Sequence, residues 1–241
     1  RNWAVWGRDF LSRYDPDPLR YYLTINMPEN RDTDWSWSDF LARNNNELLA
    51  NWGNLANRVL SFAYKHWEGF VPNPGDLREQ DLEIIAKIED GFESVGELLS
   101  SVKLRAALTE AMRLASEANK YLDVQAPWFE IKSDKDEAAK TIYTALRVID
   151  SLKVLLAPFI PFSSEKLNTF LGYDTPIYGE QIAEKISDTL GEHTVLRYIP
   201  ANANGTWEPS QLKPGQVIRK PAPLFKKLDG SIIEQELARM G

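Results

Sequence analysis

Apolar residues recur at helical spacing in four long segments of the chain. A residue pattern that steps by three and four places one apolar stripe along a helix, and that stripe must be buried against neighbouring elements. We therefore predict a mainly α fold, an antiparallel helical bundle. The four stripes are Leu48, Trp52, Leu55, Val59 and Phe62; Leu82, Ile85, Ile88, Phe92, Val95 and Leu99 within one helix over 79–99; Leu104, Leu108, Ala111, Ala115, Ala118 and Leu122; and Ala138, Ile142, Ala145, Ile149, Leu152 and Leu156.

Helix-breaking residues separate these segments. Ser133 followed by Asp136 resembles a cap at the start of the last long helix. A shorter helix near 164–171 is expected to close the bundle. The breaks themselves lie at residues 72–75, at Pro127, and at Pro158 with Pro161.

The two ends of the chain differ in character from the middle. Residues 1–36 mix a short helical piece at 8–14, a break at Asp-Pro-Asp-Pro, and the apolar stretch LRYYLTINM, which the pattern alone leaves ambiguous. Residues 194–241 contain the proline-rich stretch that ends in PAPLFKKLD, which is either a disordered tail or an extended strap. Three apolar anchors, Trp207, Val217 and Phe225, favour the strap, and SIIEQELARM is compatible with a terminal helix.

We therefore predict three parts, 1–36, 37–193 and 194–241, with the helical bundle in the middle. The chain opens on an arginine directly within an aromatic-rich stretch, RNWAVWGRDF. This opening suggests a piece cut from a longer protein. We expect the residues near the amino end and around 202–214 to be the most mobile.

Composition excludes several classes of function. Without cysteine, the chain can form neither disulfides nor thiolate metal sites, and its two histidines, His66 and His193, are far apart in sequence, so we expect no metal site. A formal charge of −7 argues against binding to duplex DNA, which depends on many lysine and arginine contacts to phosphate, but leaves recognition of a few unstacked bases open. No apolar run approaches the roughly 20 residues that span a bilayer, so we expect a cytoplasmic protein without a membrane partner.

Motifs that carry catalysis are missing from the sequence. It contains no phosphate-binding GxxxxGK[ST] loop, no GxGxxG, no HExxH and no GxSxG. Acidic pairs such as Asp15 and Asp17 are expected by chance among 35 acidic residues. We therefore expect no catalytic residues in this chain.

An asparagine-rich helix is the first candidate for binding. Asparagine is a mediocre helix former, yet six occur within one predicted helix. Asn54 and Arg58 are four residues apart, so both project from one face and offer an amide and a guanidinium to a base edge and a phosphate. The alternative is structural: the asparagines bond to neighbouring helices and Arg58 pairs with a carboxylate. The six are Asn44, Asn45, Asn46, Asn51, Asn54 and Asn57.

Trp128 follows directly on a predicted helix end in the stretch ANKYLDVQAPWFEIK. Pro127 fixes its own φ and restricts Ala126, which holds the indole stiffly at a reachable position. Such a ring suits the stacking of an unpaired base, and Asp123 could accept a hydrogen bond from the exocyclic amine of cytosine or adenine. The alternative is that Trp128, like most tryptophans, belongs to the core.

The sequence resembles the C-terminal half of the methionyl-tRNA synthetase family, class I aminoacyl-tRNA synthetases. The resemblance spans nearly the whole chain in family order. The first stretch also occurs in sister synthetases, whereas its combination with NLANR and QAPW is more specific. The four stretches are DPDPLRYYL at 15–23, NLANR at 54–58, ANKYLDVQAPW at 118–128 and PAPLFKKLD at 221–229.

The resemblance implies roles for matching positions. Trp128 would stack on the anticodon CAU, Asn54 and Arg58 would contact anticodon bases, Asp123 would help to reject wrong anticodons, and Pro127 would shape the turn. Residues 1 to about 35 resemble the family's stem-contact fold, and the proline-rich segment resembles the strap that returns to the catalytic domain. The expected partners are therefore the methionine tRNA and the catalytic domain of the same enzyme.

The resemblance also implies what this chain does not carry. The ATP site with its magnesium, the methionine site and the zinc knuckle of the family lie upstream of the matching stretches, so no cofactor is expected here. Two alternatives remain: a bundle from a sister synthetase that reads another anticodon, and a helical interaction module without an RNA ligand. The second alternative predicts a deeply buried Trp128 whose indole nitrogen is bonded inside the bundle.

Overall fold

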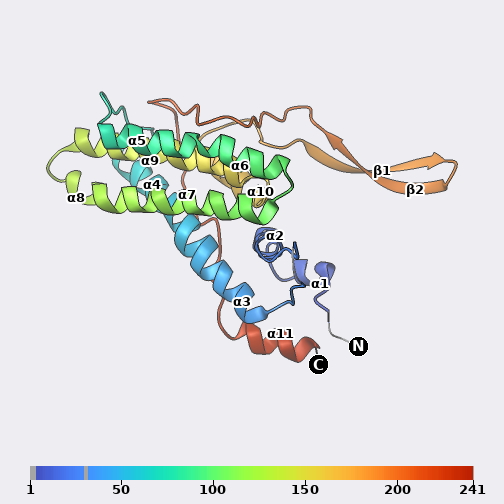
Figure 1. The fold of residues 1–241 in the computed structure, drawn as a ribbon. Coiled ribbons are helices and arrows are strands. Elements are labelled where there is room, and N and C mark those ends of the chain that lie inside the picture. The colour runs from blue at the N-terminus through green and yellow to red at the C-terminus, as the bar shows by residue number, and fades with distance from the viewer. Residues whose placement is uncertain (1–3, 30–31, 241) are drawn as a thin grey trace.

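The computed structural model describes residues 4–29 and 32–240, and shows a helical bundle from which a β-hairpin projects (Figure 1). Expectations that fall on residues 1–3, 30, 31 and 241 lie outside the described residues. No helix in the described part is long and apolar enough to cross a membrane. The bundle helices are α4 (Asn54–His66), α5 (Glu79–Glu89), α6 (Gly91–Ser100), α7 (Leu104–Gln125), α9 (Lys135–Leu156) and α10 (Pro161–Phe170).

The predicted apolar stripes form the core of the bundle. Trp52, Leu108 and Ile149, one from each of three stripes, are all at most 1% exposed. The helical bundle is therefore confirmed, and burial of these stripes is what holds α4, α7 and α9 together.

The single helix predicted over 79–99 is wrong. The chain breaks at Asp90 into α5 and α6, and Leu82 is 54% exposed rather than in the core. Gly91 begins α6 where a Cβ atom would lie 2.5 Å from a methyl of Leu114, so the absent side chain permits close packing against α7. The stripe pattern carried no sign of this break.

The start of α9 also differs from the prediction by one residue. Its cap is Asp134, whose carboxylate accepts hydrogen bonds from the backbone N–H groups of Asp136 and Glu137, each at 3.0 Å. Asp134 satisfies two of the free N–H groups of the first turn, the role we had assigned to Ser133.

The chain enters the bundle through one continuous run of helix. This run comprises α3 (Trp37–Ala42), the π-helical segment η1 (Arg43–Gly53) and α4. Several asparagines in it are structural: Asn44 and Asn45 donate to backbone carbonyls of Lys226 and Leu228 at 3.1 and 2.9 Å. These bonds fix the C-terminal segment to the helix. Asn51 donates to Ser116 of α7 at 3.0 Å, a bond to a neighbouring helix of the kind that the structural alternative predicted.

The N-terminal segment contains two helices joined and followed by irregular chain. It contains α1 (Gly7–Leu11) and α2 (Pro16–Ile25), so the ambiguous stretch LRYYLTI belongs to a helix. The buried carboxylate of Asp17 accepts a hydrogen bond from the backbone N–H of Ser163 at 2.6 Å and so caps α10, which begins at Pro161. This contact attaches α2 to the bundle.

The predicted terminal helix is present as α11 (Ile232–Met240) and packs beside α1 and α3 (Figure 1). Its buried Glu236 accepts hydrogen bonds from Arg13 at 2.8 and 2.9 Å and from Tyr14 at 2.8 Å. The two ends of the described chain therefore share one small aromatic core.

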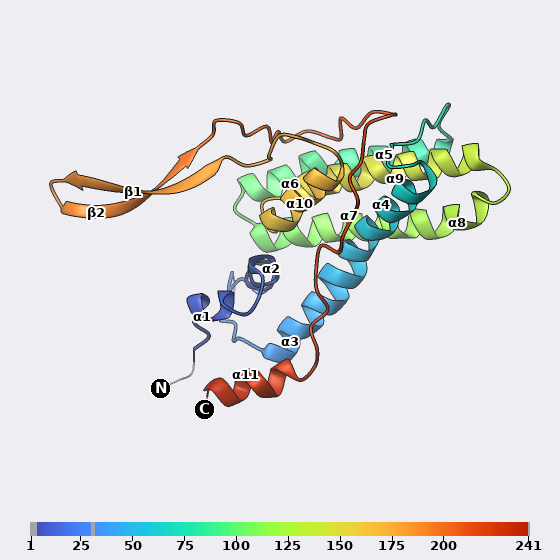
Figure 2. The same cartoon turned by 180° about the vertical axis from the view of Figure 1, so that it is seen from behind.

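A β-hairpin that the sequence did not predict occupies 180–199. Strands β1 (Glu180–Asp188) and β2 (Gly191–Ile199) are antiparallel, and they extend away from the bundle (Figure 2). Ile182, Glu184 and Ile186 alternate with more exposed residues, as is typical of a strand. The segment expected to be extended from Thr194 therefore begins inside β2.

The proline-rich segment after β2 lies along the bundle as a strap. Phe225 is 5% exposed, and its ring lies 3.0 Å from where a Cβ of Gly53 would be, so glycine permits this contact. Trp207 donates its indole N–H to the carbonyl of Phe92 at 2.9 Å. Val217, the third predicted anchor, is 57% exposed, and the buried residue is its neighbour Ile218.

Candidate nucleic-acid interface

Three of the predicted site residues meet where α4, the end of α7 and α8 (Pro127–Glu130) come together. Arg58 donates to the carboxylate of Asp123 at 2.9 Å, across 65 residues of sequence, which is the carboxylate pairing that the structural alternative predicted. Its guanidinium carbon lies 4.8 Å from the ring centroid of Trp128. The structure thus places a cation, a carboxylate and an indole in one contact group.

The turn that carries Trp128 is tight and strained. Ala126 ends α7 with φ 42° and ψ 56°, in the left-handed region that non-glycine residues rarely adopt. Pro127 is the first residue of α8, where its missing N–H costs nothing. Ala126 therefore does not adopt the extended conformation that a following proline favours, and takes a left-handed one instead. Strain of this kind is typical of functional sites.

Replacing Ala126 with glycine should raise the free energy of unfolding by about 0.5–1 kcal/mol, because glycine adopts positive φ without a Cβ clash. Urea denaturation of the two proteins measures this difference. A less stable Ala126→Gly protein would contradict the assigned strain. The exposed Ala106→Gly change in the first turn of α7 is the control and should lower stability, by about 1 kcal/mol or less.

Trp128 is half-buried, with its ring packed against the main core while part of it remains accessible. Within residues 4–29 and 32–240 its indole nitrogen makes no hydrogen bond, unlike that of Trp207. A deeply buried and bonded Trp128, which the interaction-module alternative predicted, is therefore not observed.

Asn54 is the first residue of α4, one turn before Arg58, and its side chain is exposed. Among the described residues it does not join the contact group of Arg58, Asp123 and Trp128. It remains available on the same face of α4, as the spacing of four predicted.

A cavity of about 510 Å³ adjoins Trp128 and contains several residues that the sequence analysis missed. Its titratable lining residues in the described chain are all basic: Arg58, Lys65, His66 and Lys132. Burial and the charges of Lys65 and Lys135 lower the pKa of His66. Spacing could have revealed part of this set, since Arg58, Phe62 and His66 follow Asn54 at steps of four along α4.

An ion-pair network holds the far end of α8. Arg78 lies 3.5 Å from Glu130, the last residue of α8, and donates to Thr141 of α9 at 2.7 Å. It also pairs at 2.9 Å with Asp81, which is fully buried. Burial opposes ionisation of Asp81, but hydrogen bonds from Arg78 and Tyr121 hold its pKa below the usual value. Because this network joins α5, α7, α8 and α9, it fixes the turn that carries Trp128.

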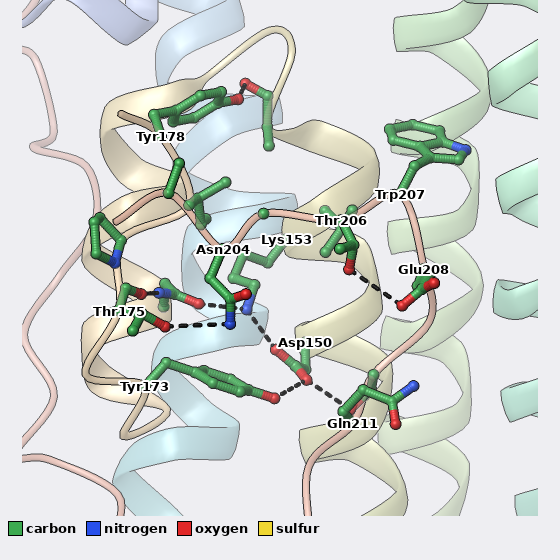
Figure 3. Close-up of a pocket in the computed structure, with 18 of the residues that line it drawn as sticks. Asp150, Lys153, Tyr173, Thr175, Tyr178, Asn204, Thr206, Trp207, Glu208 and Gln211 are labelled. Atoms are coloured by element: carbon green, nitrogen blue, oxygen red, sulfur yellow. Dashed lines mark hydrogen bonds and ion pairs between the residues drawn. The ribbon is translucent and has the colours of Figure 1, made fainter. Parts of the chain in front are cut away.

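A larger cavity lies elsewhere, beneath the strap (Figure 3). It measures about 630 Å³. Asp150 on its wall accepts hydrogen bonds from Lys153 and Tyr173 at 2.7 Å and from Ser210 at 2.6 Å. Burial and the Asp150 carboxylate raise the pKa of Tyr173. These polar groups hydrogen-bond to one another, and the bond between Asp150 and Ser210 attaches the strap to α9.

Comparison with known families agrees with this geometry. Residues 71–198 match the family model described as the anticodon binding domain of methionyl tRNA ligase. Residues 1–60 match the model described as tRNA synthetases class I (M). The first match covers the bundle from α5 onward, including Asp123 and Trp128.

Curated relatives match over the whole chain. Methionine–tRNA ligase of Thermomicrobium roseum is 51% identical over 242 residues, which are 100% of this chain and 41% of the relative. The same enzyme of Chloroflexus aggregans is 51% identical over 241 residues, 40% of its length. The chain thus spans about two fifths of the length of these relatives.

Solved structures show the same fold. The free-state methionyl-tRNA synthetase of Mycobacterium tuberculosis superposes with a TM-score of 0.73 and 26% identity, over 88% of this chain and 39% of that protein. The same enzyme bound by methionyl-adenylate gives a TM-score of 0.71 over 87% of this chain and 37% of that protein. These matches decide against both a sister synthetase and an unrelated interaction module. The chain belongs to the methionyl-tRNA ligase family and comprises that family's anticodon-binding domain.

Proposed function

We propose that this chain recognises the CAU anticodon of methionine tRNA at the junction of α4, α7 and α8. The observation that carries the proposal is the convergence of Arg58, Asp123 and Trp128, together with a cavity whose titratable lining is basic in a chain of charge −7. An indole stacks with any base, a carboxylate accepts from the exocyclic amine of cytosine, and an arginine binds a base edge or a phosphate. Asn54 and Pro127 complete the proposed site.

Without RNA, Arg58 occupies the place that a base would take on Trp128. An exposed ion pair and an exposed cation–π contact each stabilise by about 1 kcal/mol or less. A stacked base contributes about 1–3 kcal/mol, enough to displace the guanidinium, which then turns to the RNA. Asp123 loses its partner in this exchange and becomes free to accept a hydrogen bond from the base.

For the whole protein we propose methionine–tRNA ligase activity in the cytoplasm, with ATP, magnesium and zinc sites in a catalytic domain outside this chain. Residues 1 to about 35 would contact the tRNA stem. The strap, which lies between β2 and α11, would return the chain from the bundle toward that domain. We also propose the division of the chain into residues 1–36, 37–193 and 194–241, whose second boundary falls inside β2.

A titration with anticodon stem-loop RNAs tests the proposed function. We expect the 241-residue chain to bind a hairpin carrying CAU more tightly than one carrying GAU, as measured by the quenching of tryptophan fluorescence. Equal binding of both hairpins, or no binding of either, would contradict anticodon recognition by this chain. Aminoacylation by the whole protein with the same triplets tests its activity separately.

Asp123→Asn should reduce the preference for CAU over UAU by about two- to fivefold. The two triplets differ by the amine of cytosine and the carbonyl of uracil, and a carboxylate accepts from the first and repels the second. Fluorescence titration of both hairpins measures the ratio of the two dissociation constants.

The matched control is Asp174→Asn, which removes the same charge from an exposed pair with Arg219. This change should leave the ratio unaltered. An unaltered ratio in Asp123→Asn as well would show that Asp123 does not distinguish the base.

A further inference from the structure

Phe129 presents its ring to solvent directly beside Trp128. The side chain is 66% exposed, and its ring centroid lies 6.4 Å from that of Trp128 with 64° between the planes. Single exposed apolar residues are common on proteins and need no explanation by themselves. Here the exposed ring also carries a cation above it, since Lys132 lies 5.7 Å from its centroid.

We propose that Phe129 is a second stacking surface, which takes the nucleotide adjacent to the one on Trp128. This inference rests on the proposed function. Because the two rings are inclined by 64°, they cannot hold one base between them, nor two bases that remain stacked on each other. They suit two consecutive nucleotides whose bases are splayed apart, the arrangement in which single-stranded RNA is read by proteins.

The charges around Phe129 favour a nucleotide over a protein partner. Lys132 is exposed on the same turn and supplies a cation for the phosphate, while the ring supplies the surface for the base. The two acidic neighbours are engaged elsewhere: Glu130 pairs with Arg78, and Asp134 caps α9. The accessible chemistry of this turn is therefore an aromatic face with a positive charge.

Phe129→Ala should weaken binding of the CAU hairpin by about five- to 150-fold, the range for loss of one stacked base. Phe129→Leu keeps apolar area without a flat π face and should lose most of the same affinity. The matched control is Phe162→Ala, because Phe162 is 55% exposed at the start of α10, at the opposite end of the bundle from α8 (Figures 1 and 2). It should bind the hairpin as the unchanged chain does.

Hairpins with one abasic anticodon nucleotide identify the partner of each ring. If Phe129 stacks on one base, Phe129→Ala costs nothing further in the hairpin that lacks that base. We expect this loss of effect at one nucleotide for Phe129→Ala, and at an adjacent nucleotide for Trp128→Ala.

The outcomes separate the two proposals. Suppose that the unchanged chain prefers CAU. The role of Phe129 alone would then be overturned if Phe129→Ala binds within twofold of the unchanged chain, or if its effect adds to that of every abasic position. A leucine variant with full affinity would contradict stacking. An unchanged chain that binds no hairpin would overturn the proposed function and this inference with it.

Discussion

Asp150→Ala should lower the free energy of unfolding by about 3–5 kcal/mol, because it leaves the ammonium of Lys153 buried without its carboxylate. Both side chains of this pair are at most 5% exposed. The change also removes the acceptor of the Tyr173 and Ser210 hydroxyl groups, which lie at 2.7 and 2.6 Å. Urea denaturation followed by circular dichroism measures the loss, and the midpoint should fall at an unchanged slope.

A double variant distinguishes an unpaired charge from a simple packing defect. Adding Lys153→Met to Asp150→Ala removes the stranded cation and should recover part of the lost stability, since a buried pair replaced by apolar groups is often neutral. A double variant less stable than Asp150→Ala would contradict this account. Glu110→Ala, which breaks an exposed pair with Arg113, should cost about 1 kcal/mol or less.

The parts of the fold that were predictable are those that repeat at helical spacing. Trp52, Leu108 and Ile149 are in the core because a one-faced helix has no other way to bury its apolar side chains. The break at Asp90 was not predictable from this pattern, because the apolar stripe continues across it from Ile88 to Phe92. At the break Gly91 packs closely against Leu114 of α7, a tertiary contact that the stripe does not reveal.

The hairpin shows the opposite failure. Ile182 and Ile186 lie at strand spacing, but the apolar residues Ala183 and Leu196 interrupt the apolar–polar alternation, and neither face of the ribbon packs into a core. Because a proline-rich sequence follows the hairpin, the predicted extended segment began at Thr194, which lies within β2. A local signal was present and was assigned to the wrong element.

The site was only partly visible in the sequence. Asn54 and Arg58 could be placed on one face by their spacing, and Trp128 by the proline before it. The pairing of Arg58 with Asp123 joins helices 65 residues apart, so it follows from the packing of α4 against α7 and not from any local pattern. The same holds for Asp150 and Ser210, whose contact depends on the path of the strap.

Trp128→Ala should weaken binding of the CAU hairpin by about 1–3 kcal/mol, or roughly five- to 150-fold, because the base loses its stacking surface. Trp128→Phe retains an aromatic face and should lose less. Both are measured by fluorescence anisotropy of labelled RNA, since removal of the ring also removes its own fluorescence. The fold should persist, because the ring is only half-buried.

The change has a second effect that must be separated from the first. In the free protein Arg58 contacts both the Trp128 ring and Asp123. Removing the ring leaves Arg58 with Asp123 alone, which also changes how the guanidinium can meet the RNA. If that effect dominated, Trp128→Ala would cost as much in a hairpin lacking the first anticodon base as in the intact one. Stacking predicts that the cost disappears there. Phe162→Ala, which removes a ring that is 55% exposed at the start of α10, should leave binding of the short hairpin unchanged. A Trp128→Ala protein that binds the CAU hairpin within twofold of the unchanged chain would refute stacking on Trp128, because loss of the stacking surface must weaken binding.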